Sequence, residues 1–261
     1  MKNRGQVTVF IVLAIIILAI IFLFLFLRTK VYVGPASIEN LMREFPAISS
    51  HVEECLSKAV TDSTYILAQQ GGYIELKQDT YRRINGQSIS YLCYTAPDEI
   101  GCMNRMLTKS DLKKELIKSI MPQLTSCLNI KSFEKSGYTL EYGAIPEPII
   151  NIGADTITAR LDYPITIRKD SAQASVSSFS TTVTLPLGRL YSVSQDIIKT
   201  ESTLGSFNTL IYSMLKSELT NKLYTVTLKQ PYPDKQYIIK VSNGPAKEDT
   251  LVFQFLIQGE E

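Results

Sequence analysis

The amino-acid sequence predicts an α+β fold, with an N-terminal transmembrane helix followed by an extracytoplasmic domain of disulfide-tied helices and antiparallel sheet. The chain of 261 residues opens with an uncharged apolar run from Val7 to Leu27. Two later segments, 50–72 and 108–127, carry apolar residues at helical spacing and one cysteine each. Beyond Gly137 apolar residues alternate with polar ones, which is typical of half-buried strands.

The apolar run has the length of a membrane-spanning helix. At about 1.5 Å per residue it reaches roughly 30 Å, the thickness of the hydrocarbon core of a bilayer. A cleaved secretory signal has a shorter core and a small-residue cleavage site, which Arg28-Thr29-Lys30 does not provide. We therefore expect a retained anchor. Residues 1–6 form a short cytoplasmic tail, and residues 7–28 have the lipid bilayer as their partner.

Charges and cysteines place the rest of the chain outside the cytoplasm. Lys2 and Arg4 before the run give a slight bias toward a cytoplasmic N-terminus. The cysteines form no Cys-x-x-Cys pair, and the single histidine, His51, is too little for most Cys/His zinc sites. Disulfides are thus favoured over free thiols, and they persist in oxidising compartments.

Four cysteines allow three disulfide pairings. We expect Cys55 to pair with Cys127, which would tie two helices together. Cys93 would then pair with Cys102 and close a short loop. No metal site or cofactor is predicted.

We expect two subdomains, a helix and hairpin subdomain over residues 31–135 and a β-rich subdomain with two helices over residues 136–261. In the first, residues 37–45 form a short helix that Pro46 stops. A second helix begins at a capping box, Ser50 and Glu53, and ends at Gly71-Gly72. Its apolar face comprises Val52, Cys55, Ala59, Val60, Ser63, Ile66 and Leu67.

Three further elements complete the first subdomain. Residues 73–76 form a strand. Asn85-Gly86 marks a tight turn between strands 80–84 and 88–94. Thr108 and Asp111 form a second capping box, and Pro122 predicts a kink in the helix that follows.

In the second subdomain, strict alternation predicts one half-buried strand over residues 157–168, and Pro164 indicates that it lies near an edge or bulge. Segment 175–185 is its expected hairpin partner, and a flexible glycosylated stalk is the alternative. The other predicted strands are 138–144, 147–152, 223–228, 236–241 and 251–257, and the predicted helices are 189–202 and 206–222. The inner face expected for the second helix comprises Leu210, Ile211, Met214, Leu215 and Leu219.

The N-terminus, Asn3-Arg4-Gly5-Gln6-Val7-Thr8, resembles the archaeal class III signal of type IV pilin-like proteins. In that family a peptidase cuts after a small residue that follows a basic one, so the resemblance implies processing between Gly5 and Gln6, after Arg4. The fifth residue of such a mature chain is usually Glu, and here it is Phe10. This departure weakens the case for assembly into a filament, as does Gly34-Pro35, which would interrupt the long continuous stalk helix that many pilins use.

The domain that follows resembles a group of uncharacterised single-pass surface proteins of small-genome archaea. The resemblance rests on Cys55-Leu56, on Gln70-Gly71-Gly72-Tyr73-Ile74, on the segment around Cys127, on Gly137-Tyr138 and on the apolar final strand. It covers most of the chain with short motifs. It implies a location at the cell surface and the Cys55–Cys127 pairing, and it brings no catalytic residues.

Residues with catalytic chemistry are few. Hydrolase triads need a histidine, and His51 lies beside a capping box, where a cap or surface role is the common one. Ser-x-x-Lys occurs at Ser110, Ser132 and Ser213, and this recurrence in a Ser- and Lys-rich chain points to chance. A net charge of +2 gives no support for nucleic-acid binding.

We therefore expect a membrane-anchored extracytoplasmic structural or binding module and not an enzyme. Its expected partners are other envelope proteins or further copies of itself. A type IV pilin-like surface subunit is the alternative, and a cell-envelope hydrolase is the weakest candidate.

Overall fold

The computed structural model describes residues 16–21, 35–95, 102–136, 139–169, 172–220, 222–242 and 250–259. The Arg4-Gly5-Gln6 motif and most of the predicted membrane run lie outside these ranges. Of that run, residues 16–21 are described, as a helix with exposed aliphatic side chains. No helix within the described ranges is long and apolar enough to cross a membrane.

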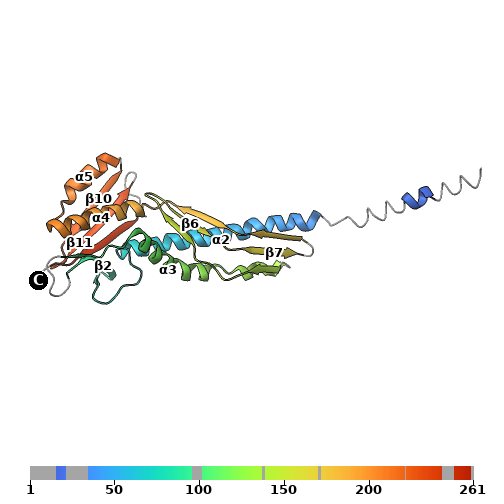
Figure 1. Cartoon of the computed structure of the whole chain (residues 1–261), viewed down its shortest axis with the longest axis horizontal. Coiled ribbons are helices and arrows are strands. Elements are labelled where there is room, and N and C mark those ends of the chain that lie inside the picture. The colour runs from blue at the N-terminus through green and yellow to red at the C-terminus, as the bar shows by residue number, and fades with distance from the viewer. Residues whose placement is uncertain are drawn as a thin grey trace, which may run out of the picture.

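One long helix, α2 (Pro35–Gln69), runs along the long axis of the molecule (Figure 1). The expectation of two helices is wrong, because Pro46, Ser50 and Glu53 all lie inside α2. Pro46 is exposed, so its missing N–H hydrogen bond leaves the buried face intact, and the turns beyond it pack against strands and α3. The predicted buried face is confirmed except for Ile66, which is 40% exposed.

The helix α3 (Lys109–Cys127) packs antiparallel to α2 and leads into a short 3₁₀ helix, η1 (Ile130–Ser136). Its predicted cap is confirmed, because the Thr108 hydroxyl accepts a hydrogen bond from the Asp111 N–H at 3.2 Å. At one end of the helix pair Gly72 lies against Leu112, and at the other Cys55 and Cys127 are at disulfide distance.

Two three-stranded antiparallel sheets flank α2 (Figure 1). The predicted strand 157–168 is two strands, because the chain leaves the ladder at Asp162-Tyr163-Pro164 and continues in the other sheet. Its apolar residues are nevertheless all buried. Segment 175–185 pairs with both halves, so the hairpin is confirmed and the stalk is wrong. One sheet contains β4 (Thr139–Tyr142), β7 (Ile165–Lys169) and β8 (Ala172–Val176), and the other β5 (Ile149–Ile152), β6 (Ile157–Leu161) and β9 (Phe179–Val183).

A larger sheet lies at the end of the molecule remote from the start of α2 (Figure 1). Its order is β1-β2-β12-β11-β10, with β3 on β2, and every pair is antiparallel except β12 with β2. The strands are β1 (Tyr81–Ile84), β2 (Gln87–Tyr94), β3 (Met103–Asn104), β10 (Leu223–Lys229), β11 (Lys235–Ser242) and β12 (Val252–Ile257).

Local hydrogen bonding and backbone conformation explain why the turn predicted in this region forms and the strand predicted over residues 73–76 does not. The predicted hairpin turn is confirmed, with Asn85 and Gly86 at φ 51° and 83°. The predicted strand 73–76 is wrong, because the N–H groups of Ile74 and Glu75 donate to the Glu115 carboxylate instead of to a neighbouring strand.

Two helices complete the fold. Helix α4 (Leu187–Leu204) buries an apolar face on the large sheet, and α5 (Thr209–Thr220) lies along β10. The α+β class is therefore confirmed, with mainly antiparallel sheets and two cysteine pairs at disulfide distance.

Candidate functional site

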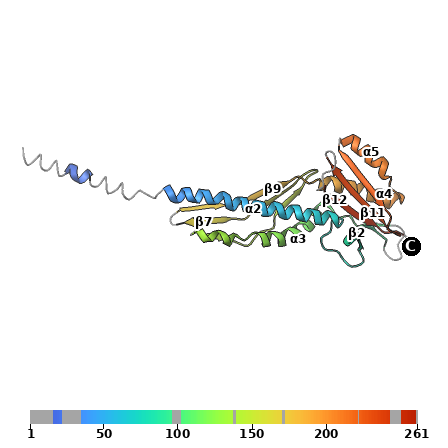
Figure 2. The same ribbon diagram turned by 180° about the vertical axis from the view of Figure 1, so that it is seen from behind.

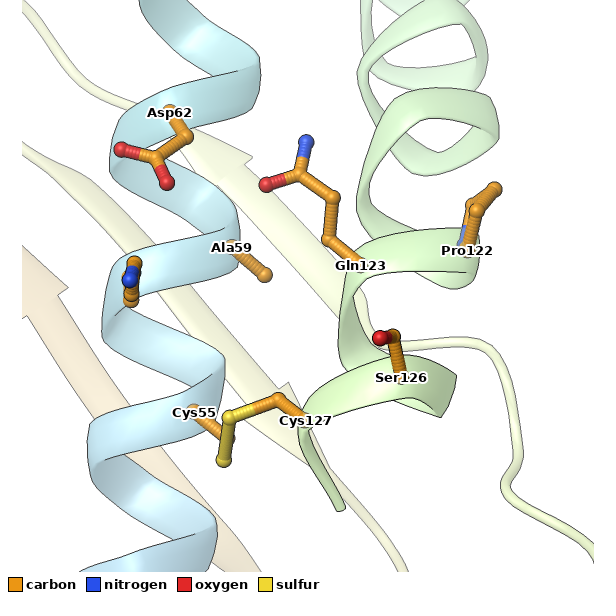
Figure 3. A pocket seen from close by; sticks show the side chains of 8 residues that line it. Cys55, Ala59, Asp62, Pro122, Gln123, Ser126 and Cys127 are labelled. Atoms are coloured by element: carbon orange, nitrogen blue, oxygen red, sulfur yellow. A yellow bond between two sulfur atoms is a disulfide. The ribbon is translucent and has the colours of Figure 1, made fainter.

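A groove of about 540 Å³ lies between α2 and α3 beside the Cys55–Cys127 pair (Figure 3). Gln123 extends from α3 toward α2, where its amide donates to the Ser63 hydroxyl at 2.9 Å. Asp62 lines the α2 side of the groove. The lining offers amide, hydroxyl and carboxylate groups and the ammonium group of Lys58, and none of the described hydrogen bonds joins a nucleophile to a base there.

Residues that the sequence singled out for chemistry are structural in their contacts. His51 lies 3.8 Å from the Cys55 sulfur and packs against the Phe133 ring at 5.5 Å between centroids. The hydroxyl of Ser213 accepts a backbone hydrogen bond, and Lys216 pairs with Asp196 at 3.2 Å. Across the described ranges, no group of three or more His, Cys, Asp and Glu side chains could hold a metal ion.

The second cysteine pair also joins two elements. Cys93 of β2 and Cys102, just before β3, are at disulfide distance with a Cα–Cα separation of 5.2 Å. The Cα atoms of Cys55 and Cys127 are 5.7 Å apart. Each cysteine therefore lies next to the partner that the sequence predicts for it.

An ion pair fixes helix α4 to the sheet of β5, β6 and β9. Asp155, between β5 and β6, accepts two hydrogen bonds from Arg189 at 2.6 and 2.7 Å, and Lys222 approaches it at 3.2 Å. The Arg189 hydrogen bonds lower the pKa of Asp155 to about 2, against the desolvation that opposes them. Nearby, Gly188 packs against the backbone of Gly153 so closely that a Cβ would overlap it.

A second network joins α4 to the large sheet. The Glu201 carboxylate is buried, and it accepts hydrogen bonds from the Tyr237 hydroxyl and, at 2.7 Å, from Lys235. Burial, together with the hydrogen bond to Glu201, raises the pKa of Tyr237 well above its ordinary value. The end of α4 from which α5 departs is therefore attached to β11 at two points.

Helix α5 has its polar face inward and its apolar face outward. The outer face of α5 comprises Leu210 (69% exposed), Ile211 (55%), Met214 (65%), Leu215 (55%) and Leu219 (81%). Exposed Leu204 and Leu223 lie in the chain just before and after the helix. The inner face of α5 comprises Thr209, Tyr212, Ser213, Lys216, Ser217 and Thr220. This is the reverse of an ordinary amphipathic helix on a core.

The edge strand β10 explains the inward polar face. The Ser217 hydroxyl accepts the Tyr224 N–H at 2.9 Å, and the Ser213 hydroxyl accepts the Val226 N–H at 3.3 Å. An edge strand otherwise carries unpaired N–H groups. Serines on α5 satisfy two of them, and Asp196 of α4 binds the Tyr212 hydroxyl at 2.5 Å.

The apolar residues predicted to share one face of this helix do share it, but the prediction that this face points inward is wrong, because the face is exposed. Periodicity gives the residues that share a face but not the surface that the face meets. The serines at 213 and 217 were the available signal, because their spacing places both hydroxyls on one side of a helix.

Helix α5 lies at the end of the molecule opposite the start of α2, as both views show (Figures 1 and 2). No protein-family model matches the chain, and neither a curated protein nor a solved structure is significantly similar to it. The candidate site therefore rests on its own geometry.

Proposed function

We propose that the protein is a membrane-anchored extracytoplasmic binding module that docks a second copy of itself through the outer face of α5. The observation that carries this proposal is the row of exposed Leu, Ile and Met side chains on a helix whose polar side is occupied by β10. Contiguous apolar patches of this kind mark interaction surfaces.

The N-terminal apolar run supports the proposed membrane anchor, and the cysteines support the proposed location of the domain outside the cytoplasm. The run from Val7 to Leu27 is uncharged, and its residues 16–21 carry exposed aliphatic side chains. Two cysteine pairs at disulfide distance suit an oxidising compartment. With the start of α2 near the bilayer, the outer face of α5 would lie far from the anchoring membrane.

The charges around α5 favour a protein partner over a lipid surface. Helices that bind membrane surfaces carry Lys and Arg on their polar side. On α5 the one basic residue is Lys216, and Asp196 neutralises it. Glu218 is exposed among the apolar side chains, and its charge would be repelled by anionic lipids.

Pairing with a second copy suits both the position of Glu218 and the energy of burial. If two α5 helices pair antiparallel about an axis near Met214 and Leu215, each Glu218 meets the first turn of the other helix, where the macrodipole is positive. Burying one exposed Leu contributes about 1.5–3 kcal/mol, and association costs about 4–15 kcal/mol. With five partly exposed apolar side chains on each of two faces, the combined gain from burial is comparable with this cost.

Sedimentation of the full chain in detergent, over a range of concentrations, tests this proposal. We expect a dimer that Ile211→Gln with Leu215→Gln converts to a monomer. Ile149 on β5 is 62% exposed, so Ile149→Gln removes a comparable side chain elsewhere and should leave the dimer intact. A wild-type monomer at every concentration, or a dimer that survives the double substitution, would contradict the second copy as partner.

A pilin-like subunit is the second candidate, favoured by the continuity of α2 through Pro46. A long helix close behind an apolar run suits the stalk of such proteins. Sequencing the mature N-terminus distinguishes the two candidates: a chain that begins at Gln6 supports prepilin processing, and one that begins at Met1 supports an ordinary anchor.

A further inference from the structure

We propose that a polar cavity between segment 73–80, β2 and α3 binds the oxyanion group of a small ligand through the Arg105 guanidinium and the Ser90 hydroxyl. The cavity has a volume of about 340 Å³. It is separate from the outer face of α5, and the proposal does not depend on the docking described above.

Two polar groups in this cavity lack partners. Ser90 is 2% exposed, and its hydroxyl has no hydrogen-bond partner in the described part of the chain. The Nη1 atom of Arg105 is also buried and likewise has no partner there. Buried polar groups are almost always hydrogen-bonded, so two unsatisfied groups lining one cavity point to a ligand that both contact.

The surrounding backbone holds Arg105 in place. Its N–H donates to the Leu92 carbonyl at 2.8 Å, and its carbonyl accepts the Tyr73 hydroxyl at 2.5 Å. The guanidinium carbon lies 5.6 Å from the centre of the Tyr94 ring, which favours a cation in that position. A preorganised guanidinium loses little entropy on binding an anion.

The carboxylates of the cavity are already engaged. Glu115 accepts the Ile74 N–H at 2.9 Å and pairs with Lys118 at 2.7 Å. Glu75 pairs with the same lysine at 3.3 Å. The guanidinium of Arg105 has no ion-pair partner among the described residues, and exposed Lys77 lines the same cavity. Arg105 and Lys77 therefore leave an excess of positive charge at the cavity.

These groups suit a carboxylate or a phosphate. Both present oxygens to a guanidinium and accept a hydroxyl hydrogen bond. The cavity has room for the rest of a small ligand in addition to its charged group, and Thr80 and Leu76 also line it.

Thermal unfolding of the full chain in detergent, with acetate, inorganic phosphate or chloride at matched ionic strength, tests the proposal. An anion that binds only the folded protein raises the melting temperature, and the stabilisation grows with the logarithm of one plus the ratio of the anion concentration to its Kd. We expect acetate, phosphate or both to raise it more than chloride does. The anion that acts identifies the source of the oxyanion. Arg105→Gln should raise the anion concentration needed for the same stabilisation about ten- to a hundredfold, because it removes a charge-assisted hydrogen bond.

Two further variants complete the design. Ser90→Ala is a small change that tests the same site if Arg105→Gln does not fold, and it should also weaken the effect. Arg83→Gln removes an exposed guanidinium from β1 and should leave the effect unchanged. Equal stabilisation by all three salts, or an unchanged anion effect in Ser90→Ala and in folded Arg105→Gln, would overturn the proposal.

Discussion

Ser217→Ala should destabilise the protein, whereas Leu215→Gln in the same helix should not. The Ser217 hydroxyl accepts the Tyr224 N–H at 2.9 Å, and Tyr224 is 3% exposed. Alanine leaves that N–H without its acceptor, which costs about 1–3 kcal/mol. The higher helix propensity of alanine returns roughly 0.5 kcal/mol. We therefore expect the free energy of unfolding to fall by about 0.5–2.5 kcal/mol.

Leu215 is 55% exposed on the outer face of α5. Leucine and glutamine have similar helix propensities, and surface substitutions usually change stability by less than about 0.5 kcal/mol. Truncating a leucine that faces a core instead costs about 2–5 kcal/mol. Leu190→Gln on α4 provides that comparison, because Leu190 is fully buried, and a buried amide adds a further penalty.

Urea unfolding followed by far-UV circular dichroism measures these differences. Ser126→Ala, at an exposed helical serine of α3, controls for helix propensity. Because assembly makes stability depend on concentration, each variant is measured at a high and a low protein concentration. A larger loss for Leu215→Gln than for Ser217→Ala at the low concentration would refute the inverted orientation of α5.

Three further predictions concern the attachments between elements. Replacing Cys55 and Cys127 by alanine should lower the free energy of unfolding by about 4 kcal/mol, because their bridge closes a separation of 72 residues. Four reactive thiols in unreduced wild-type protein would contradict both bridges. Asp155 has a folded pKa of about 2, below its ordinary 3.8, so its stabilisation is present above pH 3.8 and is lost as the pH falls through 2. Asp155→Asn should therefore cost about 1 kcal/mol at neutral pH, after allowance for screening, and much less in acid. An equal cost at both would refute the pairing. Gly188→Ala should cost about 1–3 kcal/mol, because the added Cβ overlaps the Gly153 backbone, and unchanged urea unfolding would disprove that packing.

Signals that depend on neighbouring residues predicted structure well. The Asn85-Gly86 turn, the Thr108 cap and the alternation around Ile157 all encode local geometry, and each has its expected conformation or burial. The cysteine pairs were also predicted, since Cys55 lies on the buried face of a helix.

Signals that depend on distant partners did not suffice. Residues 73–76 have side chains typical of a strand, but the N–H groups of Ile74 and Glu75 donate to the Glu115 carboxylate and not to a neighbouring strand. Pro46 breaks isolated helices, yet α2 continues through it because packing along its length compensates. The direction of α5 was wrong because it depends on the N–H groups of β10. The placement of Arg105 and Ser90 in one cavity was not foreseen, because it depends on the pairing of β2 with β3 and on segment 73–80 and α3, which complete the lining.

Photo-crosslinking in native membranes tests the proposed docking surface most directly. A photoreactive amino acid at Met214, on the outer face of α5, is compared with the same group at Ser180, which is exposed on β9. The proposed function predicts a crosslinked homodimer from position 214 and none from position 180. Crosslinks from position 214 to lipid or to a different protein would replace the second copy as partner, and equal yields from both positions would contradict a docking role for α5.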